Sequence, residues 1–304
     1  MKHMNIGIDI GGSHIGIGLV DSNGEIIKQK DKYIKVKDRL NIEDFIEKEI
    51  IGTLKVWQKN NIAIESIGIA APGIVSNGEI KYSVNLGLFG YNLKERLLKA
   101  FPNAKICIKN DAKCAALAEK NIGALKKYDD CIFLCLGTGI GGAAFYNGKL
   151  IEPKRSSGFE YGHMVIRSNG RTCRCGNRGC FEQYGSMRIF KNNIRYNLKL
   201  PKDMEGEKLR IAIRKNINKE VVKRVIDDYL ENLCIGIANI VNILEPKAIC
   251  IGGGFAKYED ILMEPLKEKF YKASHLFYKD NLPEVVMAEL GNKAGIIGSA
   301  LYIK

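Results

Sequence analysis

Residues 5–27 read NIGIDIGGSHIGIGLVDSNGEII, and this stretch decides the fold class. Apolar residues alternate with small or polar ones up to a Gly-Gly-Ser turn, and a second alternating run then leads to Asn23-Gly24. Alternation with a period of two indicates strands, and an Asn-Gly pair between two such runs is a strong hairpin signal. The stretch therefore predicts a strand, a glycine turn and a β-hairpin.

A second stretch, 136–151, repeats this design. Its sequence, LGTGIGGAAFYNGKLI, again places a glycine turn before a strand and closes a hairpin with Asn147-Gly148. Around both stretches, short apolar strand candidates alternate with helical segments, which is typical of an α/β protein. A glycine turn and a hairpin at the head of each half predict a duplicated α/β architecture with a cleft between two lobes.

Capping signals and apolar runs locate the other elements. A helix is expected over 41–60. Asn92 and Glu95 form a capping box for a helix of about ten residues, and Asn110 caps the helix that follows the strand AKICIKND. The segment KAICIGGGFA predicts a last strand ending in a glycine-rich loop, and residues 293–303 predict a terminal helix.

Length and composition are those of an ordinary globular protein, with 304 residues, 46% of them hydrophobic and 27% charged. We expect no signal peptide, because the first residues lack a long apolar region. The most apolar helix candidate, 225–244, contains acidic residues and indicates a core helix. Six of the nine cysteines stand singly in apolar runs, as buried thiols do: Cys107, Cys114, Cys131, Cys135, Cys234 and Cys250. We therefore expect a reduced, cytoplasmic protein that binds no membrane.

The net charge of +13 is the feature that most suggests a nucleic-acid partner. Its lysines are scattered along the whole chain, in segments such as KEKFYK and KNNIRYNLK, and no long run concentrates them. This distribution favours a solvated basic surface over a nucleic-acid footprint. Small anionic substrates remain compatible with it.

Three glycine-rich turns could bind phosphate, because glycine lets backbone N–H groups approach phosphate oxygens without a side chain in the way. Glycine turns also occur in hairpins for structural reasons, but three in one chain favour nucleotide phosphate. The residues are Gly11, Gly12 and Ser13 in the first turn, Gly137, Thr138, Gly139, Gly141 and Gly142 in the second, and Gly252, Gly253 and Gly254 in the third. A Walker loop and a protein-kinase motif set are absent, and a dinucleotide site fits poorly because we expect each turn to lead into a strand.

Two aspartates stand at the ends of predicted strands. Asp9 precedes the first glycine turn, where it would suit holding Mg²⁺ against ATP phosphates. Asp111 follows Asn110 at a junction between a strand and a helix. There it could accept a proton from a hydroxyl that attacks a γ-phosphate, or it could serve only the electrostatics of the helix N-terminus.

A cluster of metal-binding residue types lies between 160 and 185. His163, Cys173, Cys175 and Cys180 offer one imidazole and three thiolates, which fits a tetrahedral zinc site. Buried free thiols are the alternative, but three cysteines within a polar Arg/Asn/Gly loop disfavour it. A DNA-reading finger does not fit, because the cluster has no second histidine pair and no recognition helix between ligand pairs.

Together these motifs resemble the ROK (repressor, open reading frame, kinase) family of sugar kinases over essentially the full length. The matching segments, in order, are DIGGSHIGIGLVD, NDAKCAALAE, LGTGIGGAAFYNGKL, EYGH, CRCGNRGCFE and CIGGG. The resemblance implies an actin-like, ribonuclease-H-like ATPase fold in which two lobes close over sugar and ATP and exclude water. We expect a small lobe over 1–118, a large lobe over 119–292, and a C-terminal helix, 293–304, that returns to the small lobe.

The resemblance also implies roles for individual residues. Asp111 would be the general base that draws the proton from the 6-hydroxyl of a hexose, with ATP and Mg²⁺ as cofactors. His163 would contact both the sugar and a structural Zn²⁺ through its two ring nitrogens, and the three cysteines would complete the metal site. The other sugar hydroxyls would be bound by Asn85, Asn110, Glu160, His163 and Glu182.

The activity implied is that of an ATP-dependent hexose kinase, glucokinase-like, in a homodimer. Retention of Glu160 and Glu182 suits glucose and N-acetylmannosamine alike, and GGSHI resembles allose kinases, so these two sugars are the alternatives. A sugar-responsive repressor is disfavoured, because the first strand begins within ten residues and leaves no room for a helix-turn-helix domain. The chain departs from the family at Ser13, usually threonine, around Asn85, and at Gly158-Phe159, usually Ala-Gly.

Overall fold

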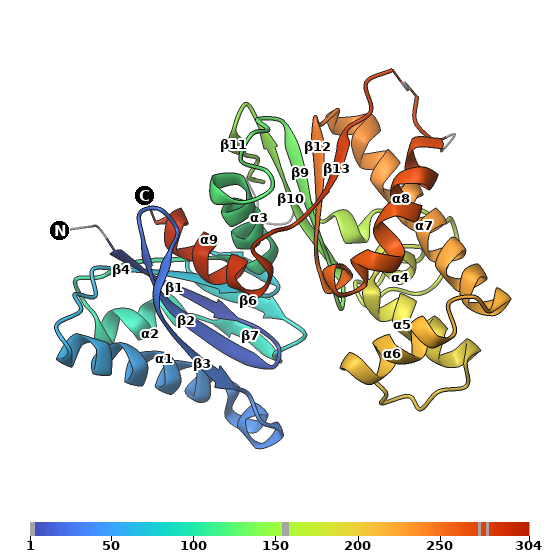
Figure 1. Cartoon of the computed structure of the whole chain (residues 1–304). Coiled ribbons are helices and arrows are strands. Elements are labelled where there is room, and N and C mark those ends of the chain that lie inside the picture. The colour runs from blue at the N-terminus through green and yellow to red at the C-terminus, as the bar shows by residue number, and fades with distance from the viewer. Residues whose placement is uncertain (1–3, 154–157, 273–274, 278–279, 304) are drawn as a thin grey trace. The chain divides into compact units, whose positions relative to one another are not determined.

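The computed structural model describes residues 4–153, 158–272, 275–277 and 280–303, which form two compact units (Figure 1). Unit 1 comprises the described residues of Met1–Lys127, Leu150–Gly158 and Glu289–Lys304. Unit 2 comprises those of Tyr128–Lys149 and Phe159–Ala288. Unit 1 thus extends past residue 118, where the sequence suggested a boundary, and includes the C-terminal helix.

Unit 1 contains a five-stranded sheet in the order β3-β2-β1-β4-β8. The first three strands are antiparallel, while β1, β4 and β8 are parallel. The strands are β1 (Met4–Ile10), β2 (His14–Asp21), β3 (Ile26–Tyr33), β4 (Ser66–Ala71) and β8 (Lys105–Asn110). The hairpin predicted around Asn23-Gly24 is confirmed, with Gly24 in the left-handed region at φ 84°.

Unit 2 repeats this sheet with the order β11-β10-β9-β12-β13, in which β10 and β9 are antiparallel while β9, β12 and β13 are parallel, as in unit 1. Its strands are β9 (Cys131–Leu136), β10 (Ile140–Tyr146), β11 (Lys149–Leu150), β12 (Ala248–Gly253) and β13 (Glu284–Met287). The duplication predicted from the two glycine-turn stretches is therefore confirmed. Strand β13 and a small sheet of β5 (Ile74–Ser76), β6 (Glu79–Ser83) and β7 (Leu88–Tyr91) were not expected.

Helices cover the sheets, and α9 ends the described chain in unit 1. Unit 1 has η1 (Val36–Asn41), α1 (Ile42–Lys59), α2 (Leu93–Ala100), α3 (Asp111–Ile122), η4 (Gly291–Lys293) and α9 (Ala294–Tyr302). Unit 2 has η2 (Tyr161–His163), α4 (Glu182–Gly185), α5 (Met187–Asn197), α6 (Gly206–Lys215), α7 (Glu220–Leu244), η3 (Gly254–Tyr258) and α8 (Glu259–Lys272). Within the described ranges, none of these helices is both long enough and apolar enough to cross a membrane.

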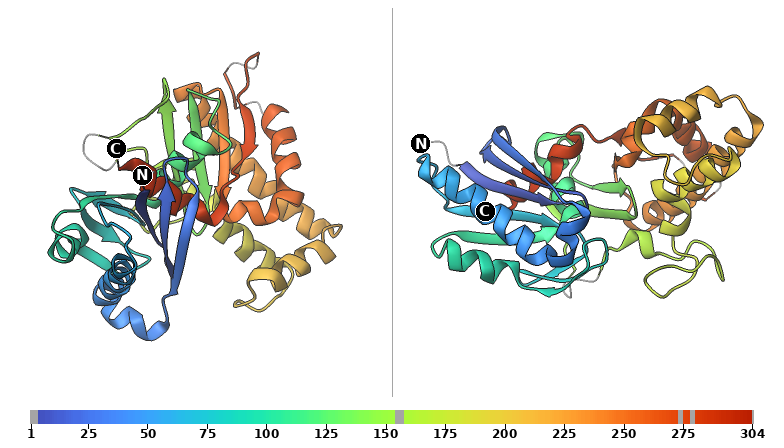
Figure 2. Two further views of the ribbon diagram at one scale, coloured as in Figure 1. Left: turned by 60° about the vertical axis from the view of Figure 1, so that its left-hand side comes forward. Right: turned by 90° about the horizontal axis from the view of Figure 1, so that it is seen from below.

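A row of glycines explains how α9 reaches the sheet of unit 1. Gly18, Gly7 and Gly68 are neighbours on β2, β1 and β4. A β-carbon on Gly7 or Gly68 would lie about 2 Å from a backbone oxygen of α9, at 2.0 Å and 1.9 Å. Only glycine therefore allows this close approach. The alternating isoleucines share a core with residues of α1 and α2. Figure 2 shows the ribbons of these elements in two further views.

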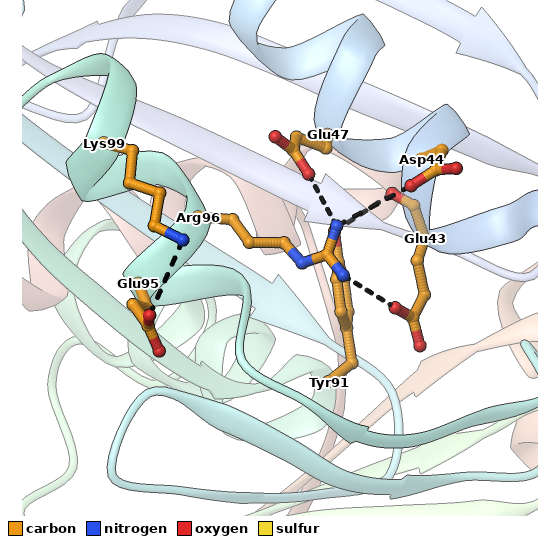
Figure 3. A network of polar contacts seen from close by, with 7 residues as sticks. All are labelled: Glu43, Asp44, Glu47, Tyr91, Glu95, Arg96 and Lys99. Atoms are coloured by element: carbon orange, nitrogen blue, oxygen red, sulfur yellow. Dashed lines mark hydrogen bonds and ion pairs between the residues drawn. The ribbon is translucent and has the colours of Figure 1, made fainter.

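An ion-pair network joins α1 to α2 (Figure 3). Arg96 on α2 contacts Glu47 at 2.9 Å and Glu43 at 3.3 Å, and its guanidinium lies 5.3 Å from the ring centre of Tyr91. The Asn92 side chain accepts the Glu95 N–H at the start of α2, so the predicted cap is confirmed. These contacts hold α1 and α2 together on one face of the sheet. They do not involve the residues at the carboxyl ends of the parallel strands.

Candidate active site and metal centre

The first glycine turn lies at the carboxyl end of β1 in unit 1. The Gly11 N–H donates to the His14 carbonyl at 2.8 Å, which closes the turn. Arg39, from η1, donates to the carbonyl oxygens of Gly12 and Asn85. Arg39 therefore brings Asn85, which is predicted to bind sugar, next to the glycine turn that is predicted to bind phosphate. No sequence signal distinguished this exposed arginine from the many other basic residues of the chain.

Asp9 and Asp111 interact at the same edge of the sheet, because β1 and β8 both end there. Burial raises the pKa of Asp9 to about 7, and the charge of Asp111 adds to the shift. Gly295 of α9 lies against Asp9, since a β-carbon there would be 2.5 Å from the carboxylate. Asp111 accepts the Ala112 N–H at 2.8 Å, as expected of an acid at a helix start. The pair thus combines a helix-capping geometry with mutual repulsion.

Asn110 caps α3 as the sequence predicted. Its Oδ1 accepts the Lys113 N–H at 3.2 Å, and its Nδ2 donates to the Gly73 carbonyl at 3.1 Å. The side chain therefore also holds the loop that follows β4. An Asn side chain offers two donor hydrogens and two lone pairs, so each end keeps capacity for a further hydrogen bond.

The second glycine turn lies at the carboxyl end of β9 in unit 2. Glu182, at the start of α4, accepts the Ile140 N–H at 3.3 Å. A β-carbon on Gly139 would lie 2.3 Å from that carboxylate, so the glycine leaves room for Glu182. The structure thus places Glu182, predicted to bind sugar, directly beside the predicted phosphate turn.

The third glycine turn departs from one expectation. Gly252 and Gly253 end β12, and Gly254 begins η3, so this turn leads into helical structure and not into a strand. Gly253 ends the strand with φ 76°, a backbone angle that only glycine adopts there without strain. Because Gly253 pairs with Leu136, the second and third turns are neighbours at one edge of the sheet.

The metal centre predicted from the sequence is assembled in unit 2. The ligand atoms of His163, Cys173, Cys175 and Cys180 all lie within 4.8 Å of one another. His163 Nδ1 is 3.7 Å from Cys173 Sγ, and Cys175 Sγ is 3.6 Å from Cys180 Sγ. Ligands at 2.1–2.3 Å from a tetrahedral zinc lie about 3.5–3.8 Å from one another. The donor set and these two spacings therefore fit zinc.

The thiols of the cluster differ in proton affinity. Burial, together with the Cys175 and Cys173 thiols, raises the pKa of Cys180. Burial also opposes ionisation of Cys175, but a hydrogen bond from the Asn177 backbone and bonds from the other two thiols lower its pKa. Cys175 therefore becomes the thiolate that a metal needs more readily than Cys180 does.

The loop around the cluster is fixed by hydrogen bonds and by glycines. The Arg171 N–H donates to the Tyr184 hydroxyl at 2.7 Å, and Gln183 Nε2 donates to Cys173 Sγ at 3.5 Å. A β-carbon on Gly179 would lie 1.8 Å from the Arg167 carbonyl oxygen. Gln183 thus supports a ligand thiol, a role that the sequence analysis did not assign.

Residues 158–163 carry the departures from the family pattern. Phe159 adopts φ 62°, which is rare for a bulky residue, and its ring packs edge-to-face on Tyr161 with centres 6.5 Å apart. The Tyr161 hydroxyl is buried without a hydrogen-bond partner among the described residues. Glu160 is exposed, and its carbonyl accepts the His163 N–H at 2.9 Å. Phe159 therefore holds a strained backbone next to Glu160.

The predicted site residues are divided between the two units. Unit 1 holds Asp9, Gly11, Gly12, Ser13, Asn85, Asn110 and Asp111. Unit 2 holds Gly137, Thr138, Gly139, Glu160, His163, Cys173, Cys175, Cys180, Glu182, Gly252, Gly253 and Gly254. The described residues include all nine cysteines, and none of them forms a disulfide; of the six predicted to be buried, Cys107 and Cys135 are only half-buried.

The duplicated α/β fold, its glycine turns and the Cys/His cluster define the class of this protein, and comparison with known proteins identifies its family. The model described as the ROK family matches residues 5–304. This chain belongs to the ROK family, as the motifs suggested.

Individual relatives span nearly the same length. A glucokinase of Thermotoga maritima is 31% identical over 98% of this chain and 96% of its own. A xylose repressor of Caldicellulosiruptor bescii is 29% identical, over 96% of this chain but 76% of the repressor. The crystal structure of a ROK family glucokinase from Streptomyces griseus, in complex with glucose and AMPPNP, has a TM-score of 0.80 at 26% identity and covers 98% of both chains. The predicted actin-like α/β fold class is confirmed.

Proposed function

We propose that this chain is an ATP-dependent hexose kinase that phosphorylates the 6-hydroxyl of its sugar, with glucose as the first substrate to test. The observation that carries the proposal is the Asp9–Asp111 pair beside the first glycine turn. Full-length similarity to a glucokinase supports it. One acid placed for a proton and one placed for phosphate-bound metal are what phosphoryl transfer to a hydroxyl requires.

In this proposal the two aspartates divide the chemistry. Asp111 accepts the proton of the 6-hydroxyl as that oxygen bonds to the γ-phosphorus of ATP and the bond to ADP breaks. Asp9 would hold Mg²⁺, which neutralises phosphate charge when it is bound. The backbone amides at Gly11, Gly12 and Ser13, at the second turn, and at Gly252–Gly254 would bind the nucleotide.

The remaining predicted residues would orient the sugar. Asn85, Asn110, Glu160 and Glu182 would bind its other hydroxyls. His163 turns Nδ1 toward Cys173, which leaves Nε2 for the sugar. Zinc held by His163 and the three cysteines would be structural, and it would order the loop that carries Glu160 and Glu182.

The sugar itself and the class of protein each have an alternative. N-acetylmannosamine and D-allose are the other candidate sugars, because both glutamates are present and GGSHI is retained. A sugar-responsive regulator is the alternative from a different class. Similarity to a glucokinase over 98% of this chain, together with the Asp9–Asp111 pair, favours a kinase. We further propose a cytoplasmic homodimer with no nucleic-acid or membrane partner.

A coupled ADP-release assay tests this function across glucose, N-acetylmannosamine, N-acetylglucosamine, mannose, fructose and allose. We expect glucose to give the highest kcat/KM. Asp111→Asn should lower kcat about 10²- to 10⁴-fold, the usual contribution of a general base, with little change in sugar Kd. Asp203→Asn, an exposed loop change in unit 2, is the matched control.

Two outcomes would contradict the proposal. Near wild-type turnover by Asp111→Asn would show that Asp111 is not the general base. Absence of turnover of every sugar by the wild-type protein with ATP and Mg²⁺ would reject the kinase activity itself.

A further inference from the structure

One residue outside the sheet, Arg188, fixes the second glycine turn. Arg188 lies in the first turn of α5. Its backbone N–H donates to the Gly137 carbonyl at 3.2 Å, and its Nε donates to the Thr138 carbonyl at 3.1 Å. Two consecutive carbonyls of the turn are therefore directed at a single arginine.

The direction of these carbonyls sets the direction of two N–H groups. In a planar trans peptide, the carbonyl and the N–H of the next residue point to opposite sides. The N–H groups of Thr138 and Gly139 must therefore point away from α5. Within the described part of the chain neither N–H has an acceptor, whereas the next one, of Ile140, is bonded to Glu182.

Two adjacent, unoccupied N–H groups form a concave donor pair of the kind that binds anions. Thr138 is exposed and Gly139 is partly exposed, so the pair can be reached from solvent. Glu182 closes the pair on one side, since its carboxylate occupies the Ile140 N–H and would repel an anion there. The donors available to a phosphate are thus limited to Thr138 and Gly139.

We propose that Arg188 is a positioning residue for nucleotide binding, because its two hydrogen bonds aim the Thr138 and Gly139 amides at a phosphate. This inference rests on the proposed kinase function, in which the second turn binds ATP. The essential feature of Arg188 in this inference is the Nε donor, which holds the Thr138 carbonyl. Direct contact between the guanidinium charge and a phosphate is the competing explanation.

Three substitutions separate the donor from the charge. In glutamine, Nε2 stands at the same number of bonds from the backbone as Nε in arginine, and it donates without a charge. In methionine, a methyl group takes that place and donates nothing. Lysine keeps the charge but carries its ammonium one atom further out. Arg224→Met, on the exposed side of α7 in the same unit, is the control.

The experiment measures the Kd of AMPPNP with Mg²⁺ by calorimetry without sugar, together with both KM values, kcat and the unfolding midpoint. We expect Arg188→Met to raise the nucleotide Kd and the KM for ATP about tenfold, the effect of losing a hydrogen bond of 1–2 kcal/mol. Arg188→Gln should stay within about threefold of wild type. The KM for sugar and the unfolding midpoint should not change.

Each contrary result has a separate meaning. If Arg188→Lys keeps nucleotide affinity while Arg188→Gln loses it, charge contact replaces positioning and the inference is overturned. Equal loss of sugar and nucleotide affinity, or no effect of Arg188→Met, also overturns it. If the wild-type protein binds nucleotide but phosphorylates no sugar, the proposed function fails while the role of Arg188 is still measured. If the wild-type protein binds no nucleotide, both fail.

Discussion

The glycine turn after β1 and the glycine turn after β9 stand at the same place in two sheets with the same strand order. Each turn is held by an arginine from a helical segment: Arg39 donates to the Gly12 carbonyl, and Arg188 to the Thr138 carbonyl. Two residues before the turn, unit 1 has Asp9 and unit 2 has Cys135. The scaffold is shared, and the difference lies in which side chains carry charge.

That difference shows two ways to place acids near a glycine turn. In unit 1 the acids belong to the sheet edge itself, where burial and mutual repulsion raise the pKa of Asp9. In unit 2 the acid is Glu182, which comes from outside the sheet and follows the Cys/His loop directly. Unit 1 should therefore lose stability when Asp9 ionises. The stability of unit 2 should depend on the proposed zinc.

Metal removal should give the largest contrast between the units. We expect about one zinc per chain by elemental analysis, and a loss of roughly 10 kcal/mol of binding free energy when it is removed. Hydrogen exchange should then rise in residues 160–185 and stay unchanged in β1 and β2. The affinity for sugar should fall at the same time, because the loop carries Glu160 and His163.

Two cysteine substitutions make the same comparison without a chelator. Cys175→Ser removes a ligand in unit 2, and Cys107→Ser changes a half-buried thiol in unit 1. Only the first should reduce zinc content. Full sugar affinity in a zinc-free protein would show that the cluster does not order the residues proposed to bind sugar.

Asp9 should give the next largest effect, and it concerns unit 1 alone. Its pKa is raised from 3.8 to about 7, so between these pH values the folded protein keeps a proton that the unfolded chain releases. Stability must then fall as pH rises through this window, by at most about 4 kcal/mol. Asp9→Asn cannot lose a proton and avoids this loss.

Thermal unfolding in EDTA, without nucleotide, measures this effect. Asp9→Asn should unfold several degrees higher than wild type at pH 8 and at nearly the same temperature at pH 4, because each kcal/mol shifts the midpoint by about 2–4 °C. Its kinase activity should be lost. Asp203→Asn should show neither change. An Asp9→Asn protein that is no more stable at pH 8 would mean that the carboxylate is well solvated.

The sequence predicted the features whose signals are local. Asn23-Gly24, Asn147-Gly148, Asn92 and Asn110 each act through their own backbone neighbours, and the structure confirms all four. The cysteine cluster was also readable, because three of its ligands lie within eight residues of one another.

Contacts between distant segments were not readable. Arg39 and Arg188 act on carbonyl oxygens, which every residue has, so no motif identifies them. The third turn was expected to lead into a strand, because GGG alone does not show that Gly253 ends β12 and starts η3. The packing of α9 on the glycine row depends on partners about 290 residues apart, such as Ile8 and Ser299, whose hydroxyl accepts the Ile8 N–H.

The smallest effects should come from matched alanines in the two turns. In Gly12→Ala the new methyl group meets nothing within 4 Å, whereas in Gly139→Ala it would lie 2.3 Å from Glu182 Oε2. Neither glycine has positive φ, so alanine strains neither backbone. Each change should therefore alter the free energy of unfolding by about 1 kcal/mol or less.

The two alanines should instead differ in which substrate they affect. Gly139→Ala must displace Glu182 from the Ile140 N–H, so the KM for sugar should rise about five- to tenfold if Glu182 binds a hydroxyl. Gly12→Ala should leave the KM for sugar unchanged and weaken the binding of ATP, because its methyl group enters the space expected for phosphate. An unchanged KM for sugar in Gly139→Ala would show that Glu182 only holds the turn. The acid of unit 2 would then have no substrate contact to match the one proposed for Asp111.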